Sequence, residues 1–593
     1  IEPIEGLTLR SSYGGSFVGF HSNFFNRQTY ENSENNASFG YGENQGFVYD
    51  WTFTNTANYK FSLSDSHNFN VLAGYESLST GDGRVSGASG INPFSRNLDF
   101  INLNNVEANP PGSNYLVPSL FASVFGSLNY NYNDKYYFTA VVRRDGSSRF
   151  GANQRYGTFP AFSAAWRMTS EPFMQNQNFF TDLKIRGGWG QMGNSNNVDA
   201  NNRFSLFAQS FGGSSYAIDG SNGSVALGFD QVRIGTENAR WETAVTSNIG
   251  FDATILGGKV DVIADLWRKE TNDLLVNLPI PAVAGNAASP AVNIGSMLNQ
   301  GLDMAITYRD KFSSDFGFEL TLNGAFLKNE ITKFTDDVDF FGSGGSRING
   351  QIVRNEVGRS LSSFFGYQVV GLFQSDAEVN DAPDQPGAAP GRFRFEDNNG
   401  RDDEGNLTGQ PDGVINEADR TFLGSAVPDF TGGVNLKLTY KNFDLTAFLY
   451  TSLGNEIYNN SKWFTDFYGT FRGASVSTRV LDSWTPDNRD TDVPIYESAA
   501  NFSTSQESNS YYVEDGSYLR LSLLTLGYTL PDGVLGSRLE KLRVAFSVNN
   551  LFTITGYDGL DPAVGGSADT DFGVDVGNYP VTQAFNFSLG VDF

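Results

Sequence analysis

The final thirteen residues, 581–593, read VTQAFNFSLGVDF and alternate without interruption between two faces. One face is largely apolar and holds Val581, Gln583, Phe585, Phe587, Leu589, Val591 and Phe593. Such a period of two predicts a β-strand. A terminal strand of this length that ends in Phe is typical of outer-membrane barrels. The alternative is an edge strand of a soluble sandwich, where so long an apolar strand would be an aggregation hazard.

The same alternation recurs in pairs of segments joined by short turns. Lys441-Asn442 separates residues 436–440 from residues 443–449, and Gly257-Gly258 precedes an alternating segment at 260–266. These pairs predict antiparallel hairpins. Around Leu523 the apolar phase switches to Leu524, which predicts a β-bulge or a change of environment. Counting such segments gives roughly 18 to 20 strands, a number that suits a closed barrel better than an open sheet.

The composition agrees with a membrane barrel. The chain has 593 residues, of which 51 are Phe, 26 Tyr and 65 Gly, yet its mean hydropathy is −0.31. A barrel reconciles these values, because apolar side chains face lipid while polar side chains face the interior. No stretch approaches the ~18 apolar residues of a membrane-spanning helix, so a membrane crossing would require β-strands. We therefore predict an all-β, transmembrane antiparallel barrel over residues 1–593.

Connections between the predicted hairpins are unequal in length. Short turns alternate with long polar stretches near residues 79–117, 329–361, 372–428 and 454–517. This asymmetry is expected of outer-membrane barrels, whose periplasmic turns are short and whose extracellular loops are long. Residues 1–10 already alternate as a strand and show no signal peptide, so we expect an export signal upstream of them.

Charge and residue usage exclude several classes of function. The 40 basic and 66 acidic residues give a net charge of −26, which argues against nucleic-acid binding. Cysteine is absent, and the two histidines, His21 and His67, lie in no recognisable catalytic motif; His67 is predicted to lie at a hairpin turn. We therefore predict that the chain is not an enzyme.

One segment has the pattern of a calcium-binding loop. If residues 401–411 form an insertion, five residues take positions 1, 3, 5, 7 and 12 of such a loop: Asp397, Asn399, Asp412, Val414 through its carbonyl, and Asp419. Gly413 would make the sharp turn. Surface turns are also rich in these residue types, so an ordinary turn is the alternative. We predict a structural Ca²⁺ here and no cofactor that activity requires.

A second candidate site is the aromatic segment within residues 454–517. Trp463, Phe464, Phe467 and Tyr468 give it a density of rings that is unusual for a solvated loop. Such rings stack on sugar faces or anchor a partner protein, whereas the alternative is that they pack the loop against itself. We predict that these four residues contact substrate or a lid protein.

Several motifs resemble the SusC/RagA family of TonB-dependent outer-membrane transporters. They match the family in order and spacing from about residue 7 to residue 593, and comprise NDKYY at 133–137, RRDGSSRFG at 143–151, FPAF at 159–162, LKIRGGWG at 183–190, WTP at 484–486, GSYLR at 516–520 and NNLF at 549–552. The resemblance implies a plugged barrel of about 22 strands. It also implies that the plug, the first strands and the TonB contact precede this segment.

The resemblance further implies a function and partners. The expected activity is active import of a nutrient, an oligosaccharide or a peptide, across the bacterial outer membrane. Expected partners are TonB, which supplies energy, a SusD-like surface lipoprotein that acts as a lid, and outer-membrane lipid. The alternative function is a structural or secretion-complex scaffold built on the same barrel.

Overall fold

The computed structural model describes residues 1–29, 36–108, 111–209, 213–220, 225–277, 285, 287–336, 338–344, 347–467, 475–531, 541–566 and 570–592. The chain divides into two compact units. Unit 1 comprises Ile1–Gln175, Lys184–Ile249 and Arg268–Met297, and unit 2 comprises Asn176–Leu183, Gly250–Trp267 and Leu298–Phe593.

Eighteen of the described strands belong to the largest sheet, in agreement with the predicted count of roughly 18 to 20. In unit 1 they are β1 (Leu7–Asn26), β2 (Gly40–Ser64), β3 (His67–Ile91), β4 (Glu107–Ala108), β5 (Gly112–Leu116), β6 (Ser119–Tyr132), β7 (Tyr136–Ser147) and β8 (Tyr156–Arg167). In unit 2 they are β19 (Phe316–Phe334), β26 (Phe430–Tyr440), β27 (Phe443–Leu453), β30 (Tyr518–Thr529), β31 (Lys541–Thr555) and β33 (Ala584–Asp592). Four more, β9 (Phe180–Asn194), β14 (Glu242–Ile255), β15 (Val260–Asn272) and β18 (Gly295–Lys311), contribute residues to each unit.

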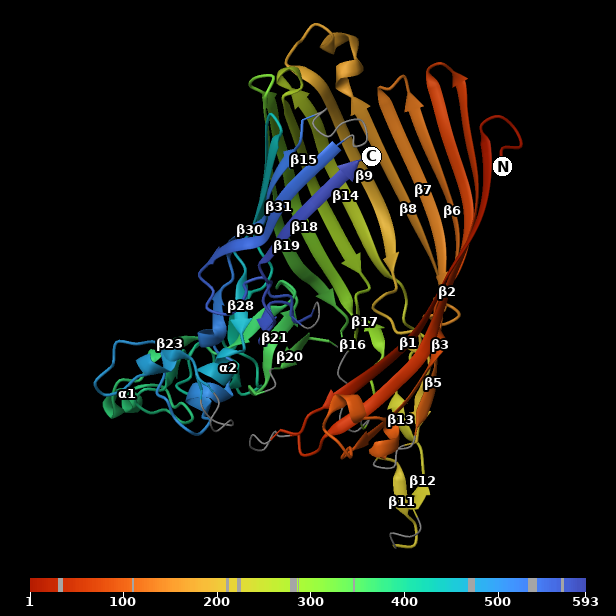
Figure 1. The fold of residues 1–593 in the computed structure, drawn as a ribbon. Coiled ribbons are helices and arrows are strands. Elements are labelled where there is room, and N and C mark those ends of the chain that lie inside the picture. The colour runs from red at the N-terminus through yellow and green to blue at the C-terminus, as the bar shows by residue number, and fades with distance from the viewer. Residues whose placement is uncertain are drawn as a thin grey trace. The chain divides into compact units, whose positions relative to one another are not determined.

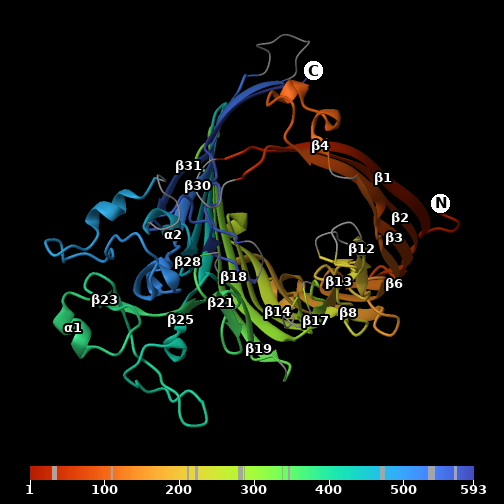
Figure 2. The same ribbon diagram turned by 90° about the horizontal axis from the view of Figure 1, so that it is seen from below.

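Neighbouring strands within each unit pair in the antiparallel sense. In unit 1, β2 pairs with β1 and β3, and β3 continues through β6 to β7 and β8. Figures 1 and 2 show these long strands side by side. In unit 2 the order of pairing is β19, β26, β27, β30, β31 and β33. The alternation of the final segment therefore forms a paired strand, with Phe593 outside the described residues.

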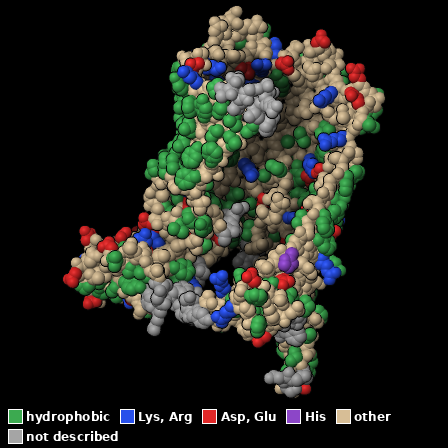
Figure 3. Space-filling view, in the orientation of Figure 1, with side chains coloured by type: hydrophobic (Ala, Val, Ile, Leu, Met, Phe, Trp, Pro, Cys, Tyr) green, Lys and Arg blue, Asp and Glu red, His purple; other side chains and the backbone are tan. Residues whose placement is uncertain are grey.

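The register of unit 2 sorts side chains into apolar and polar rows. One row crosses six strands and consists of Phe318, Leu438, Leu445, Leu526, Phe546 and Phe587. The next row, on the opposite face, consists of Glu319, Lys437, Thr446, Thr525, Ser547 and Asn586. Phe587 is 73% exposed, and Figure 3 shows apolar side chains gathered around the strands labelled β30 and β31. An exposed apolar face of this extent requires lipid or a partner protein to cover it.

The predicted turns and bulge are present. Lys441 adopts φ 51° between β26 and β27, and Gly257 and Gly258 have φ values of 68° and 92° between β14 and β15. In β30 the register shifts between Leu521 and Leu523 against both neighbouring strands, which leaves Ser522 as the bulged residue. The predicted change of phase is therefore a β-bulge.

The long connections are more ordered than their polar sequences predict. The predicted connections at 79–117 and 329–361 begin inside strands, because β3 continues to Ile91 and β19 continues to Phe334. In unit 2 the connections form small sheets and two short helices: β20 (Phe340–Gly344), β21 (Gln351–Glu356), β22 (Ser363–Gly366), β25 (Thr421–Ser425), β23 (Val369–Leu372), β24 (Phe393–Phe395), β28 (Glu456–Asn459), β29 (Val513–Asp515), β32 (Val574–Asp575), α1 (Asp376–Asp381) and α2 (Lys462–Thr465). In unit 1 they form three two-stranded ribbons: β10 (Leu206–Ala208) with β13 (Asp230–Arg233), β11 (Ser215–Ala217) with β12 (Val225–Leu227), and β16 (Leu275–Asn277) with β17 (Ala291–Asn293).

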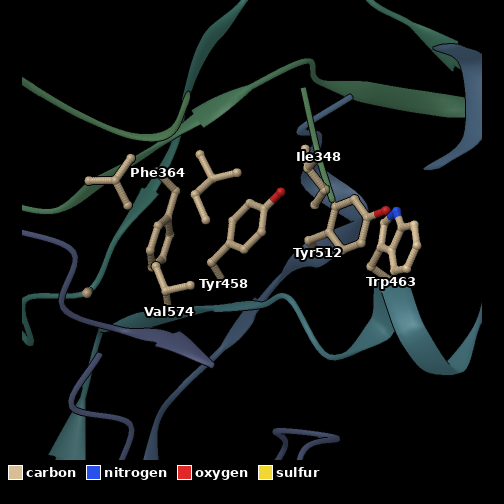
Figure 4. Close-up of a cluster of buried hydrophobic side chains, with 9 residues drawn as sticks. Ile348, Phe364, Tyr458, Trp463, Tyr512 and Val574 are labelled. Atoms are coloured by element: carbon tan, nitrogen blue, oxygen red, sulfur yellow. The ribbon is translucent and has the colours of Figure 1, made fainter. Parts of the chain in front are cut away.

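Buried side chains lie mainly in these connections. In unit 2 the largest cluster includes Ile348, Phe364, Tyr458, Trp463, Tyr512 and Val574 (Figure 4). In unit 1 a cluster around Phe150, Phe159 and Trp241 holds the ends of several strands together. The folded connections thus have hydrophobic cores of their own, whereas the apolar face of the sheet is left exposed.

Candidate functional site

The predicted aromatic site lies partly inside the core of unit 2. Trp463 is 6% exposed, and its indole N–H donates a hydrogen bond of 3.0 Å to the carbonyl of Ser505. Phe467 is partly buried against the same cluster, whereas the Phe464 ring is 36% exposed. Tyr468 lies outside the described residues. The structure therefore places Trp463 in a packing position, and substrate contact by these residues stays a prediction.

Charged groups beside this cluster are paired, with Asp466 buried and Arg479 partly buried. Arg479 donates to the Asp466 carboxylate at 2.6 Å, and the Tyr511 hydroxyl donates to the same carboxylate at 2.8 Å. Burial lowers the pKa of Arg479, but the hydrogen bond and charge of Asp466 outweigh burial and leave that pKa above its ordinary value. Burial, with Asp466 alongside, also raises the pKa of Tyr511. This network stabilises the folded connection rather than leaving a free reactive group.

The predicted calcium loop is brought together, but its oxygens accept backbone hydrogen bonds. The Asp397 carboxylate accepts the backbone N–H groups of Asp412 and Gly413. Asp419 is fully buried, and its carboxylate accepts the N–H groups of Asn398 and Asn399 on one oxygen and of Asn416 on the other.

The predicted shape of that loop agrees with the structure. Gly413 has φ 86°, as the sharp turn requires, and residues 401–411 form a separate exposed turn. The Asp412 carboxylate accepts the backbone N–H of Val414, and the Val414 carbonyl accepts the side-chain amide N–H of Asn416. The side-chain oxygen of Asn399 accepts the backbone N–H of Gly409. Within the described residues, no group of three or more Asp, Glu, His or Cys side chains could hold a metal ion. Calcium binding stays a prediction.

Polar residues on the strands of unit 2 form a charged wall. Glu319 on β19 lies opposite Lys437 on β26 in the strand register. Asp444 on β27 and Arg543 on β31 form a two-point ion pair of 2.6 and 3.2 Å across the intervening strand β30. These groups lie on the face opposite the apolar row, so this face presents both signs of charge to solvent or solute.

Two cavities in unit 2 share Glu456, and the smaller is lined by residues of β27 that follow Asp444 of the charged wall. The larger, of about 580 Å³, is lined by the ends of β19, β25 and β28 and by Ser360, Ser363 and Ser425, whose hydroxyls form one hydrogen-bonded group. The smaller, of about 240 Å³, is lined by Tyr450, Tyr518, Asn455 and Glu456 among others. Glu456 lines both. Sequence reasoning missed these cavities; the only signals were a tyrosine on the polar face of β27 and the GSYLR motif at 516–520.

The histidines do not form a catalytic arrangement. His21 lies 3.6 Å from Glu43 with a side chain that is 59% exposed, and the His67 ring is 2.8 Å from the Tyr130 hydroxyl. In the part of the chain that the structure describes, neither histidine is hydrogen-bonded to a serine. His67 is the first residue of β3, next to the turn at Asp65-Ser66, as predicted.

The fold defines a class of protein. None of the described helices is long and apolar enough to cross a membrane. A large antiparallel sheet with an exposed apolar face, a polar opposite face and long folded connections is the arrangement of an outer-membrane β-barrel.

Comparison with known proteins identifies the family. Residues 4–551 match the family described as TonB dependent receptor-like, beta-barrel, and the chain belongs to this family. It is an outer-membrane protein of SusC/RagA type, and members of this family are transporters rather than enzymes.

Two curated relatives and one solved structure illustrate the similarity. The chain is 31% identical over 611 residues to TonB-dependent receptor P3 of Formosa agariphila, covering 100% of this chain and 57% of that protein. It is 31% identical over 494 residues to TonB-dependent receptor SusC of Bacteroides thetaiotaomicron, covering 81% of this chain and 44% of SusC. The structure of the RagAB peptide transporter superposes with a TM-score of 0.81 at 25% identity, covering 100% of this chain and 61% of the other. The chain thus spans little more than half the length of the first relative.

Proposed function

We propose that this chain is the barrel wall of an active importer of a large nutrient, an oligosaccharide or a peptide, across the outer membrane. The observation that carries the proposal is the two-faced sheet of unit 2. Its apolar row from Phe318 to Phe587 suits lipid, and its polar row from Glu319 to Asn586 suits a solute path. Family membership gives this arrangement its functional context.

The partners form part of the same proposal. A SusD-like surface lipoprotein would cover the folded connections of the chain, and TonB would deliver energy through a segment of the longer protein. The similarity to SusC and to the RagAB peptide transporter supports such a pair of partners. A peptide is the cargo that the second similarity favours, because RagAB is described as a peptide transporter.

Uptake by cells tests the proposal. A strain that lacks the gene should lose accumulation of labelled oligosaccharides or peptides too large for general porins, and wild-type accumulation should cease when a protonophore removes the energy source. Purification of the full-length protein should yield a stoichiometric surface lipoprotein. Equal uptake by both strains, with secretion proteins co-purifying, would instead establish the scaffold alternative.

A further inference from the structure

The smaller cavity of unit 2 combines aromatic walls with a carboxylate. The Tyr450 and Tyr518 rings have centroids 5.9 Å apart and planes inclined at 51°. Pro428 and Phe572 add apolar walls, and Glu456 contributes the acidic group. A volume of about 240 Å³ is below the ~300–1,000 Å³ of pockets that hold a whole drug-sized ligand. The cavity is therefore of a size for one side chain or one ring of a larger solute.

The bulge at Ser522 gives the cavity its position on the polar face. Thr446, Phe448, Tyr450 and Ser452 follow Asp444 along β27 at a period of two, so all lie on the face of the charged wall. Because of the bulge, Arg520 pairs with Tyr450 and Tyr518 with Ser452. Paired residues of antiparallel strands share a face, so without the extra residue both side chains would lie on the apolar face.

The Glu456 carboxylate has backbone and acidic neighbours. One of its carboxylate oxygens accepts the Ser425 backbone N–H at 2.8 Å. Among the described residues no lysine or arginine lies within ion-pair distance of it, and the nearby charges that act on it, Asp429 and Asp515, are also acidic. Burial raises the pKa of Glu456, and these two acids raise it further.

The basic groups of this region have other partners. Arg520 lies over the Tyr518 ring, 5.1 Å from its centroid, and forms an ion pair of 2.6 Å with Asp561. Its charge is thus already balanced. In the larger cavity, Lys328 is paired with Glu330 at 3.0 Å, and the Arg359 guanidinium lies 4.4 Å from the Phe422 ring centroid. Glu456 is left as an acidic group that both cavities share without a matched cation.

We infer that the smaller cavity binds a basic side chain, lysine or arginine, of an imported peptide. The inference rests on the proposed import function and specifies its substrate class. The methylene stem of such a side chain would lie against the Tyr450 and Tyr518 rings on the cavity wall, since aromatic rings attract cations. The charged head would pair with Glu456. A neutral sugar ring would also stack on tyrosine, but it would leave Glu456 without its counter-ion.

Binding of matched probes to the full-length protein, purified with its partners, tests the inference. The probes are two N-acetylated, C-amidated octapeptides that differ only in having arginine or its neutral analogue citrulline at one position. Maltoheptaose serves as a glycan probe. We expect titration calorimetry to show about tenfold tighter binding of the arginine peptide, equivalent to about 1.4 kcal/mol, because only its guanidinium forms a charge-assisted hydrogen bond with the Glu456 carboxylate.

Variants assign the preference to the cavity. Glu456→Gln should reduce the ratio of the two affinities to less than about twofold, since the substitution keeps the shape and removes the charge. The matched control is Glu404→Gln, which removes the same charge from an exposed turn of unit 2 and should keep the tenfold preference. Tyr518→Leu should weaken binding of the arginine peptide more than that of the citrulline peptide.

The outcomes separate this inference from the proposed function. Equal affinity of the wild-type protein for both peptides, or an unchanged ratio in Glu456→Gln, overturns the subsite while import can still be observed. The protein could instead bind maltoheptaose, lose that binding in Tyr518→Leu and show no preference for arginine. This result would assign the cavity to sugars and would also overturn the inferred basic subsite. Loss of the gene without any loss of uptake removes the import function, whatever the probes show.

Discussion

Asp444 and Arg543 form an ion pair that spans an entire strand. Asp444 lies on β27 and Arg543 on β31, and their two contacts of 2.6 and 3.2 Å pass over Gly527 of β30. A Cβ atom at Gly527 would approach Asp444 Oδ1 to 2.5 Å and would also collide with the Arg543 guanidinium. The absence of a side chain at Gly527 is therefore what allows the two charges to meet.

Replacing Gly527 with alanine should break this ion pair and destabilise the sheet. We expect a loss of about 0.5–1 kcal/mol, because the pair is partly exposed and both side chains can move aside when they separate. Gly590→Ala is the matched control, because its nearest contact, the Arg543 carbonyl oxygen, would lie at 3.9 Å. The temperature at which the folded band of each variant disappears in SDS gels measures the stability of both variants. Similar temperatures for the two variants would contradict the steric argument.

Truncating Trp463 should destabilise unit 2, whereas truncating its neighbour Phe464 should not. Trp463→Ala removes a buried ring and leaves the Ser505 carbonyl without its donor, a change that costs about 3–5 kcal/mol in a core. Phe464 is more exposed, so Phe464→Ala should lower the free energy of unfolding by less than about 1 kcal/mol. Unfolding monitored by tryptophan fluorescence, with binding measured separately, distinguishes a packing role from ligand contact. A stable Trp463→Ala protein with lost binding would favour ligand contact.

Asp419 should be the residue that holds the 397–419 segment in shape. Its buried carboxylate accepts three backbone N–H groups, and their loss in Asp419→Ala should cost about 1–3 kcal/mol for each donor left buried. Limited proteolysis should then cut the segment several times faster than in wild type. Asp403→Ala, in the exposed turn, is the control and should be cut at the wild-type rate.

The predicted calcium ion is tested on the same segment. If the ion binds, calcium should slow proteolysis of the wild-type protein, and a chelator should reverse the protection. Asp397→Asn should abolish the calcium response. Proteolysis that is unaffected by calcium and chelator, with no calcium in elemental analysis of the purified protein, would leave the hydrogen bonds of Asp397 and Asp419 as the whole explanation of the segment's shape.

The pKa of Glu456 gives a pH prediction. Burial raises it above its unfolded value, so this carboxyl stabilises the fold below its unfolded pKa and loses that contribution as pH rises through the folded pKa. At pH 7 the ionised group is therefore unfavourable. Glu456→Gln should raise the unfolding temperature at pH 7, and the difference should shrink towards about pH 4. A variant that is less stable than wild type at pH 7 would contradict the raised pKa.

Local patterns were sufficient to predict the strands of this protein. The period of two in residues 584–592 and the Lys441 turn depend on side chains a few positions apart, so the paired strands β33, β26 and β27 could be predicted directly. The change of phase around Leu523 likewise predicted a bulge or a change of environment, because one extra residue reverses the faces of all that follow, and the structure has the bulge at Ser522. The motifs at 143–151 and 516–520 predicted the family.

Tertiary structure alone decided which side chains are available to a solute. Trp463 and Phe464 are adjacent and equally aromatic, yet only the first is buried, because it joins a cluster with Ile348, Phe364 and Tyr512 from distant segments. Glu456 is one of 66 acidic residues, and it is distinguished only by Tyr450 and Tyr518, which the register of β27 and β30 brings beside it. Alternation along a strand is a local property that sequence fixes, whereas burial and the pairing of charges depend on contacts between residues far apart in the chain.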